Sequence, residues 1–398
     1  MLPVGEALRI VLSHCRRLPP EMLPLNAAAL GLVLAEDVAS DLDSPPFDKS
    51  LMDGYAVRAA DLHDGRATLP VAGEVTAGQM PPALSPGQAI RIMTGAPIPA
   101  GADCVVRIEQ TRLLVDGRVS IESSPPKAGQ FILRRAAEMK AGDVVMAAGE
   151  VLGPQELGLL AGVGRTTAKV IPAPAVSILS TGDELVEANQ TPRGGQIRNS
   201  NGPMLTGQVT RAGGVPRYLG IGRDDEAALK SLIRQELQSP ILILSGGVSM
   251  GKLDLVPGVL KNLGMESHFH QVEMKPGKPL LFGACGQTLV FGLPGNPVSS
   301  FCCFELFVRP AIRSLAGHAN PGPNWQQAKV AEQFQYSTDR PTYHPAILEN
   351  IDGTNCVRQV PWFGSPDLRA LTKANALMLL AAGSQTYMAG SNLPVLPL

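Results

Sequence analysis

Residues 173–318 alternate between short apolar runs and amphipathic stretches with helical spacing. The runs VSILS and ILIL have the composition of buried strands, and EAALKSLIRQEL after Asp224-Asp225 has that of a capped helix. Such alternation is typical of a parallel sheet covered by helices, because parallel neighbours need a crossover connection. The pattern predicts a three-layer α/β domain with a mostly parallel sheet.

The regions on either side of this segment are richer in short β-prone runs and turns. Residues 45–138 contain the dipeptide Asp116-Gly117, which suits a hairpin turn, and they predict an inserted β domain. Residues 319–398, with a hairpin signal at Asp352-Gly353, predict a small C-terminal β domain. A chain of 398 residues is too long for one core, so several domains are expected.

Three helices are expected before residue 173, two of them near the N-terminus and one shortly before residue 165. Apolar residues recur at helical spacing from Val4 to Cys15, and a second helix is predicted over Leu25 to Glu36. The segment GPQELGLLAGVG predicts a third short helix that ends at glycine.

Composition excludes several classes of function. The net charge is −1, which predicts neither nucleic-acid nor anionic-membrane binding. The six cysteines form no C-x-x-C pair, which favours a reducing compartment. The N-terminus has charges among its apolar residues, unlike a signal peptide, and the uncharged stretch from Lys278 to Glu305 is broken by proline and glycine. We therefore expect a cytoplasmic protein.

Two loops follow predicted strands of the α/β domain. The segment SGGVSMGKLD contains Gly246, Gly247, Ser249 and Asp254, and its backbone N–H groups could bind an anion while Asp254 holds a metal. The alternative is an ordinary glycine turn with a capping aspartate. The segment STGDEL places Glu184 at the same sheet edge, where a hydrated Mg²⁺ could bind, although helix capping by Asp183 is equally compatible.

Three further segments contain candidate site residues, two of them after the glycine-rich loop and one near the start of the chain. Lys275 and Lys278 lie in a turn stiffened by prolines and could form an oxyanion clamp, or could simply be solvated. Ser299, in FGLPGNPVSS, opens a predicted helix whose first N–H groups would face the same edge, or it is a helix cap. Asp53, in FDKSLMDGYA, would by itself indicate only a turn, and it becomes a candidate site residue only when the other segments are considered with it. The histidines, including His268 and His270, have no convincing metal-ligand spacing.

The ordered set of these segments resembles the molybdopterin molybdenumtransferases (the MoeA and gephyrin E-domain family). The segments FDKSLMDGYAVRAAD, RIMTGAPIPAGAD, STGDEL, SGGVSMGKLD, MKPGKPLLFG and FGLPGNPVSS occur in the family's order, and GSPDLRALTKANAL resembles its C-terminal signature. The resemblance spans about Val4 to Leu398. It implies a MoaB- and MogA-like α/β domain, and it implies that residues 1–44 and 139–172 form one discontinuous domain.

The resemblance also implies a reaction. Adenylylated molybdopterin and molybdate would enter, AMP would leave, and molybdenum would be delivered to the dithiolene with the help of Mg²⁺. The family forms elongated homodimers, so the site would be composite between two subunits. Contacts with molybdopterin adenylyltransferase and with recipient molybdoenzymes would be expected.

The roles implied by the resemblance fall into three groups. The metal would be held by Asp53, Glu184, Asp254 and, less directly, Glu138. The oxyanion pocket would use Lys275, Lys278, Ser299, Arg340 and Ser365. Thr94 would lie near the site, and Gly246, Gly247 and Ser249 would hold the pterin phosphate.

Two positions depart from the family's pattern. The family commonly has R-x-G-x-D where this chain has Arg134-Arg-Ala-Ala-Glu138. It also often has R-P-x-F-x-R, where this chain has Arg340-Pro-Thr-Tyr-His-Pro345 and so keeps the first arginine and lacks the second. Weaker molybdate binding or binding of another anion is compatible with these changes.

Three alternative functions remain open at the level of the sequence. They are a molybdopterin adenylyltransferase, which would lack the flanking domains, a non-catalytic scaffold, and a molybdate or tungstate storage protein.

Overall fold

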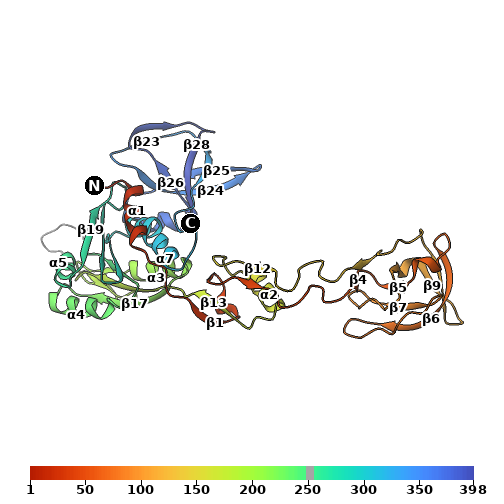
Figure 1. Cartoon of the computed structure of the whole chain (residues 1–398). Coiled ribbons are helices and arrows are strands. Elements are labelled where there is room, and N and C mark those ends of the chain that lie inside the picture. The colour runs from red at the N-terminus through yellow and green to blue at the C-terminus, as the bar shows by residue number, and fades with distance from the viewer. Residues whose placement is uncertain (248–254) are drawn as a thin grey trace.

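The protein is elongated, with two compact bodies at one end and a separate sheet at the other (Figure 1). The computed structural model describes residues 1–247 and 255–398. An α/β body and a C-terminal barrel lie together, a small middle body follows, and the inserted sheet with β5 and β7 lies at the far end (Figure 1). The predicted multidomain α/β and β architecture is confirmed.

The α/β body contains a six-stranded sheet in the order β17-β14-β18-β21-β20-β19. The first four strands are parallel, and β20 and β19 are antiparallel to their neighbours. The strands are β14 (Ala175–Thr181), β17 (Val215–Gly222), β18 (Ile241–Ser245), β19 (Glu266–Gln271), β20 (Pro279–Cys285) and β21 (Thr288–Leu293). The prediction of a mostly parallel sheet is therefore confirmed.

Helices cover both faces of this sheet. Its helices are α1 (Val4–His14), α3 (Asn201–Arg211), α4 (Glu226–Glu236), α5 (Leu255–Asn262), α6 (Pro297–Cys303) and α7 (Arg309–Leu315), with a π-helical turn η4 (Phe304–Val308) between the last two. Strand residues alternate between the layers: Ile241 and Ile243 pack with α1, α3, α6 and α7, whereas Leu242 and Leu244 pack with α4 and α5. No helix in the described ranges is long and apolar enough to cross a membrane.

The middle body is built from both sides of the inserted sheet. It contains β1 (Glu21–Pro24), β2 (Val33–Leu34), β3 (Val38–Ala39), β12 (Val144–Met146), α2 (Pro154–Gly162) and β13 (Thr167–Ile171). Strand β13 pairs with β1 and β2, and β12 pairs with β3. Segments that precede and follow the inserted sheet in the sequence are therefore paired with one another in this body.

The prediction of a helix over Leu25 to Glu36 is wrong. The segment contains one 3-10 turn, η1 (Ala27–Ala29), followed by Gly31 with a φ of +80° and then β2. The backbone N–H groups of Leu34 and Gly31 donate to the carbonyls of Glu150 and Leu152, both at 2.8 Å. Pairing with a distant segment therefore outweighs the local helical spacing of the apolar residues.

The inserted sheet has six strands in the order β8-β5-β7-β6-β10-β9. Its strands are β5 (Gly54–Val57), β6 (Arg66–Val75), β7 (Ala89–Ile92), β8 (Cys104–Arg107), β9 (Thr111–Leu113) and β10 (Arg118–Glu122), and β4 (Lys49–Ser50) pairs with β11 (Ile132–Leu133) beside it. The hairpin predicted at Asp116-Gly117 joins β9 and β10 and is confirmed.

The C-terminal body is a closed barrel in the order β22-β25-β24-β26-β28. Its strands are β22 (Gln326–Val330), β24 (Thr342–Ile351), β25 (Thr354–Gln359), β26 (Ala376–Leu380) and β28 (Asn392–Pro397), with β23 (Phe334–Thr338) and β27 (Gly383–Tyr387) as a separate pair and a short helix α8 (Leu368–Leu371). The predicted hairpin at Asp352-Gly353 joins β24 and β25.

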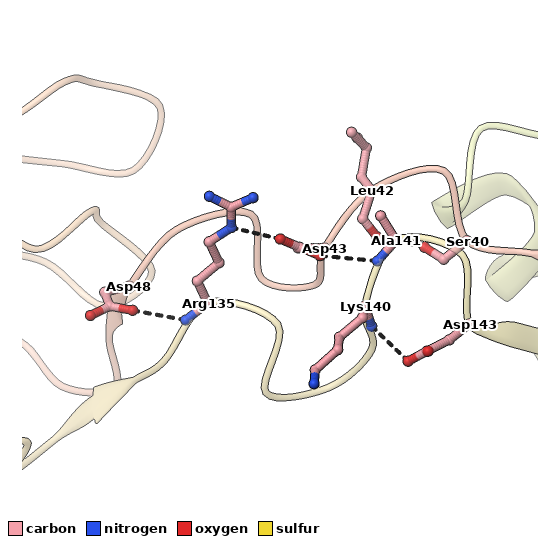
Figure 2. A network of polar contacts seen from close by, with 8 residues as sticks. All are labelled: Ser40, Leu42, Asp43, Asp48, Arg135, Lys140, Ala141 and Asp143. Carbon is pink, nitrogen blue, oxygen red and sulfur yellow. Dashed lines mark hydrogen bonds and ion pairs between the residues drawn. The ribbon is translucent and has the colours of Figure 1, made fainter.

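Two antiparallel connectors carry the inserted sheet, and charged side chains tie them together (Figure 2). The side chain of Arg135 donates from Nε to Asp43 at 2.6 Å, and its backbone N–H donates to Asp48 at 2.8 Å. The backbone N–H of Ala141 donates to the other oxygen of Asp43 at 3.0 Å. These cross-links reduce the freedom with which the inserted sheet can move relative to the middle body.

Candidate functional site

A pocket of about 580 Å³ opens at the carboxyl ends of β14 and β18. Its walls come from the turn after β14, the segment that leads into α3, the end of β18 and the loop before α6. In open parallel sheets this edge is a common ligand site, because the loops that follow the strands converge there. Glu184, Gly246 and Gly247 line this first pocket, as the sequence predicts.

The position of Glu184 depends on the turn that precedes it. Gly182 has a φ of +143°, and a Cβ at this position would lie 2.4 Å from Oε2 of Glu184. Glycine therefore lets the Glu184 side chain fold back over the turn. The neighbouring Asp183 instead accepts a hydrogen bond through its Oδ1 from the backbone N–H of Asp224, at 3.2 Å. Glu184 is the one carboxylate that the described residues contribute to the lining of this pocket.

Gly246 and Gly247 bring the next loop against the end of β14. Their φ angles are +94° and +61°. A Cβ on Gly246 would lie 2.5 Å from the carbonyl oxygen of Thr181, and one on Gly247 would lie 2.9 Å from its Oγ1. This close backbone approach is what the glycine-rich segment predicts for a loop that binds an anion through its N–H groups.

Two buried oxygen atoms in the first pocket have no hydrogen-bond partner among residues 1–247 and 255–398: Oγ1 of Thr181 and Oδ1 of Asn201. Asn201 donates from Nδ2 to Ser245 Oγ at 2.9 Å and to the Gly295 carbonyl at 2.8 Å, so its orientation is fixed. Its Oδ1 is left as an acceptor. Because unpaired buried polar atoms are costly, these oxygens indicate a place for a polar ligand.

A second pocket of about 500 Å³ adjoins the first and shares Pro279, Pro294 and Asn296 with it. All five residues predicted for oxyanion binding line this second pocket: Lys275, Lys278, Ser299, Arg340 and Ser365. They come from the turn between β19 and β20, from α6 and from two segments of the C-terminal body. The tertiary structure therefore brings this predicted group together.

Backbone hydrogen bonds fix the lysine turn to the C-terminal body. The N–H of Lys275 donates to the Pro341 carbonyl at 2.9 Å, and the N–H of Tyr343 donates to the Lys275 carbonyl at 2.7 Å. The Arg340 guanidinium donates from Nη1 to the Met274 carbonyl at 3.2 Å. Lys275 and Arg340 are thereby held on opposite sides of one domain junction.

Ser365 is tied to the start of α6 in a similar way. Its carbonyl accepts the N–H of Val298 at 3.0 Å, and its Oγ accepts from Nδ2 of Asn296 at 3.0 Å. The Ser299 side chain lies in the first turn of the same helix and is almost fully buried. Two hydroxyl groups from different domains thus lie beside a helix N-terminus, which favours anions.

The second pocket is cationic. Two lysines and Arg340 line it, and no carboxylate belongs to the part of its lining that the structure describes. Arg340 donates from Nε to Asp339 at 2.9 Å, and this hydrogen bond lowers the pKa of the Asp339 carboxyl. The indole Nε1 of Trp362 is buried there without a partner in the described ranges, and an indole N–H can only donate. The arrangement suits a small oxyanion.

Asp53 directly precedes β5 and Thr94 follows the end of β7, and these strands lie at the opposite end of the molecule from β17 and β19 (Figure 1). Thr94 donates its backbone N–H and its Oγ1 to Oδ1 of Asp53, at 2.6 and 2.7 Å. These hydrogen bonds lower the pKa of the Asp53 carboxyl. Within one chain, this pair does not share a site with Glu184.

Glu138 lies beside the connectors rather than at the first pocket. Its carboxylate accepts a hydrogen bond from Ser44 Oγ at 2.6 Å and lies 3.8 Å from Nζ of Lys49. Ser249 and Asp254, two further predicted residues, fall outside the described residues. In the ranges that are described, no three His, Cys, Asp or Glu side chains gather as they would around a metal ion.

Three lining residues were missed by sequence reasoning. Asn201 and Trp362 have no distinctive sequence pattern, and Thr181 is distinguished in the sequence only as one residue of the turn in STGDEL. Asn201 opens α3 after the short strand β16 (Ile197–Arg198). A polar residue at a helix start usually indicates capping, so the sequence offers no signal that its amide faces a pocket.

Three family profiles match the chain in order. They are described as "MoeA N-terminal region (domain I and II)" over residues 2–164, "Probable molybdopterin binding domain" over 177–314 and "MoeA C-terminal region (domain IV)" over 327–398.

Among curated relatives, a Nostoc sp. protein named molybdopterin molybdenumtransferase is 38% identical over 93% of this chain and 87% of its own length. A Bacillus subtilis protein of the same name is 33% identical over 99% of this chain and 94% of its own length. A solved structure titled "molybdopterin biosynthesis moeA protein" from Pyrococcus horikoshii OT3 has a TM-score of 0.84 and 29% identity, with both chains covered completely.

Proposed function

The chain belongs to the molybdopterin molybdenumtransferase family, and we propose that the two adjoining pockets of its α/β body are the substrate site of this activity. The protein is thus a transferase of molybdenum cofactor biosynthesis. The observation that carries the proposal is that one cationic pocket is lined by all five predicted residues, Lys275, Lys278, Ser299, Arg340 and Ser365.

Each of the two pockets has a lining that suits a different substrate. The cationic second pocket suits molybdate, a tetrahedral dianion, since lysine, arginine and hydroxyl donors surround it. The first pocket suits adenylylated molybdopterin, with Gly246 and Gly247 offering backbone N–H groups to phosphate. Shared walls at Pro279, Pro294 and Asn296 would bring the two substrates side by side, as insertion of molybdenum with release of AMP requires.

The donors of the first pocket fit a divalent cation such as Mg²⁺. This ion is usually held by one or two carboxylates together with water and substrate phosphates. Glu184 and the unpaired oxygens of Thr181 and Asn201 are hard oxygen donors of this kind. Asp254, which lies outside the described residues, is a further proposed metal ligand on the strength of the family resemblance alone. When bound, the cation would supply charge neutralisation at the phosphate bridge.

A homodimer would complete the site. Asp53 and Thr94 lie too far from Glu184 along the elongated chain to act in the same subunit (Figure 1). We propose that Asp53 of the partner subunit approaches the first pocket. Glu138 would have to leave Ser44 and Lys49 before it could contact a metal.

We propose domains at residues 1–44 with 139–172, 45–138, 173–318 and 319–398, although α1 packs against the core of the α/β body. The six cysteines are free thiols, which supports a reducing compartment such as the cytoplasm. Contacts with an adenylyltransferase and with recipient enzymes are part of the same proposal.

AMP release from adenylylated molybdopterin, with Mg²⁺ and molybdate present, tests the activity. We expect molybdate-dependent release in the unmodified chain and a loss of about tenfold or more in Lys275→Ala, because one charged hydrogen-bond donor to the oxyanion is removed. Lys329→Ala, on the barrel strand β22, is a matched control. Binding of the pterin without AMP release at saturating molybdate would instead indicate a scaffold or a storage protein.

A further inference from the structure

A third pocket, of about 510 Å³, lies between α7 and residues 320–324, which lead into β22. Arg309 and Arg313, one helical turn apart, form one wall. None of its lining residues belongs to the two pockets at the sheet edge. Arg313 follows Ser299 on the continuous segment α6–η4–α7, so roughly 20 Å of helix separates this pocket from the proposed molybdate pocket.

The positive charge around this third pocket exceeds the negative charge. Glu305, fully buried in η4, is the carboxylate that neutralises this helix face. It forms ion pairs with Arg211 and, at 3.2 Å, with Arg309, and it accepts a hydrogen bond from Gln208 at 2.8 Å. These donors occupy its oxygens. Arg313 has no carboxylate partner in the described part of the chain.

Arg313 is held in a costly position. Its Nε is buried and has no acceptor among the residues that the structure describes. Burial and the neighbouring charge of Arg309 lower the pKa of Arg313, and the His318 pKa is lowered by burial and by Arg313. Two like charges spaced four residues apart on a helix repel each other. An acceptor with negative charge would remove both penalties.

The opposite wall contributes donors and no negative charge. Residues 320–324 have the sequence Asn-Pro-Gly-Pro-Asn, and none of the residues lining the pocket is acidic. The amides of Asn320 and Asn324 can donate hydrogen bonds, and the two prolines restrict the backbone that carries them. Two guanidinium groups facing two amides form a donor set typical of sites for tetrahedral oxyanions.

We propose that the pocket between α7 and residues 320–324 is a second oxyanion site, which binds a tetrahedral dianion of the molybdate, sulfate or phosphate type through Arg309, Arg313 and the two asparagine amides. The site is separate from the proposed catalytic pockets and does not depend on them. Its occupancy neutralises the excess charge of α7 and links this helix to the segment that enters the barrel.

Equilibrium dialysis of the full chain with labelled molybdate tests this proposal by counting sites. The unmodified chain should bind two equivalents, and Arg313→Gln and Asn320→Asp should each bind one, with an affinity loss of about tenfold or more at the altered site. Asn320→Asp changes an exposed residue and therefore tests the site even if Arg313→Gln fails to fold. Arg234→Gln, an exposed arginine of α4, is the matched control and should bind two.

The Lys275→Ala chain isolates the proposed site from the catalytic pocket. Molybdate bound to this variant should be lost on adding Arg313→Gln, and competition by sulfate or phosphate shows which dianion the site prefers. If the catalytic pocket binds no molybdate, the unmodified chain shows one site and Arg313→Gln still removes it. Absence of binding of all three dianions to Lys275→Ala, or binding that Arg313→Gln and Asn320→Asp leave intact, would overturn the proposal.

Discussion

At the residue scale, the most informative side chains are polar groups that the fold buries. His344 of β24 is 5% exposed and lies edge-on to the rings of Tyr336 and Trp362. Its Nδ1 lies 2.8 Å from the Pro345 carbonyl, which assigns the proton to that nitrogen. His344 therefore supports the aromatic wall of the second pocket in its neutral form.

The pH dependence of stability follows from this burial. Burial lowers the pKa of His344, and the His268 and His318 pKa values shift in the same direction. The unfolded chain, with histidine pKa values near 6.5, then binds more protons than the folded chain as the pH falls through that value. We expect the melting temperature to fall between pH 7 and pH 5.5, and less steeply in His344→Phe.

Calorimetry across this pH range checks the histidine prediction. His63→Phe, at an exposed site of the inserted sheet, serves as the control and should retain the slope of the unmodified chain. An equal slope in His344→Phe and the unmodified chain would contradict the assignment. The range lies above the ordinary carboxylate pKa values, so the aspartates contribute little to it.

At the scale of elements, the turn between β19 and β20 carries the lysines, and its shape depends on Gly277. This residue has a φ of +109°, and a Cβ there would lie 2.6 Å from Sγ of Cys303 in α6. The turn is therefore packed directly against the helix that carries Ser299. Strain at this point would displace Lys275 and Lys278 from the second pocket.

Gly277→Ala should both destabilise the protein and reduce activity. The loss in unfolding free energy should be about 1–3 kcal/mol, as expected for a non-glycine residue forced into an unfavourable φ region. Gly158→Ala is the matched control, because Gly158 lies inside α2 with open space around it. Alanine there should be neutral or stabilise by up to about 1 kcal/mol. Denaturant titration and AMP release measure the two effects, and equal behaviour of both variants would refute the argument.

At the scale of the whole molecule, the elongated shape separates residues that the proposed chemistry combines. The connectors that Figure 2 shows hold the inserted sheet away from the α/β body of the same chain. Asp53 can therefore act with Glu184 only across a subunit interface. A symmetric dimer with one site in each half would satisfy this geometry.

Complementation between two inactive chains tests the composite site. Asp53→Ala and Lys275→Ala should each retain about a tenth of full activity or less alone, and their co-refolded mixture should recover about a quarter of full activity. Half of the dimers would be mixed, and each would contain one intact site. A mixture of Asp53→Ala with Asp53→Asn is the control and should recover nothing. No recovery with mixed dimers present would show that Asp53 acts within its own subunit or not at all.

The sequence by itself determined the features that depend on near neighbours. The strand and helix alternation of 173–318, the hairpins at Asp116-Gly117 and Asp352-Gly353, and the helix at 154–162 follow from periodicity and turn chemistry within a few residues. The order of the motifs also identified the family, and with it the candidate residues. These signals are local or linear, so they survive without knowledge of the fold.

Only the tertiary structure decided which distant residues meet. Segment 25–36 has the spacing of a helix, yet β2 within it pairs with β13 and takes the extended form. Lys275 and Arg340 share one pocket because the barrel docks on the lysine turn, whereas Asp53 and Glu184 are separated by the connectors. Long-range pairing and domain docking depend on surfaces that the chain creates only when it folds, and the sequence of one segment does not contain them.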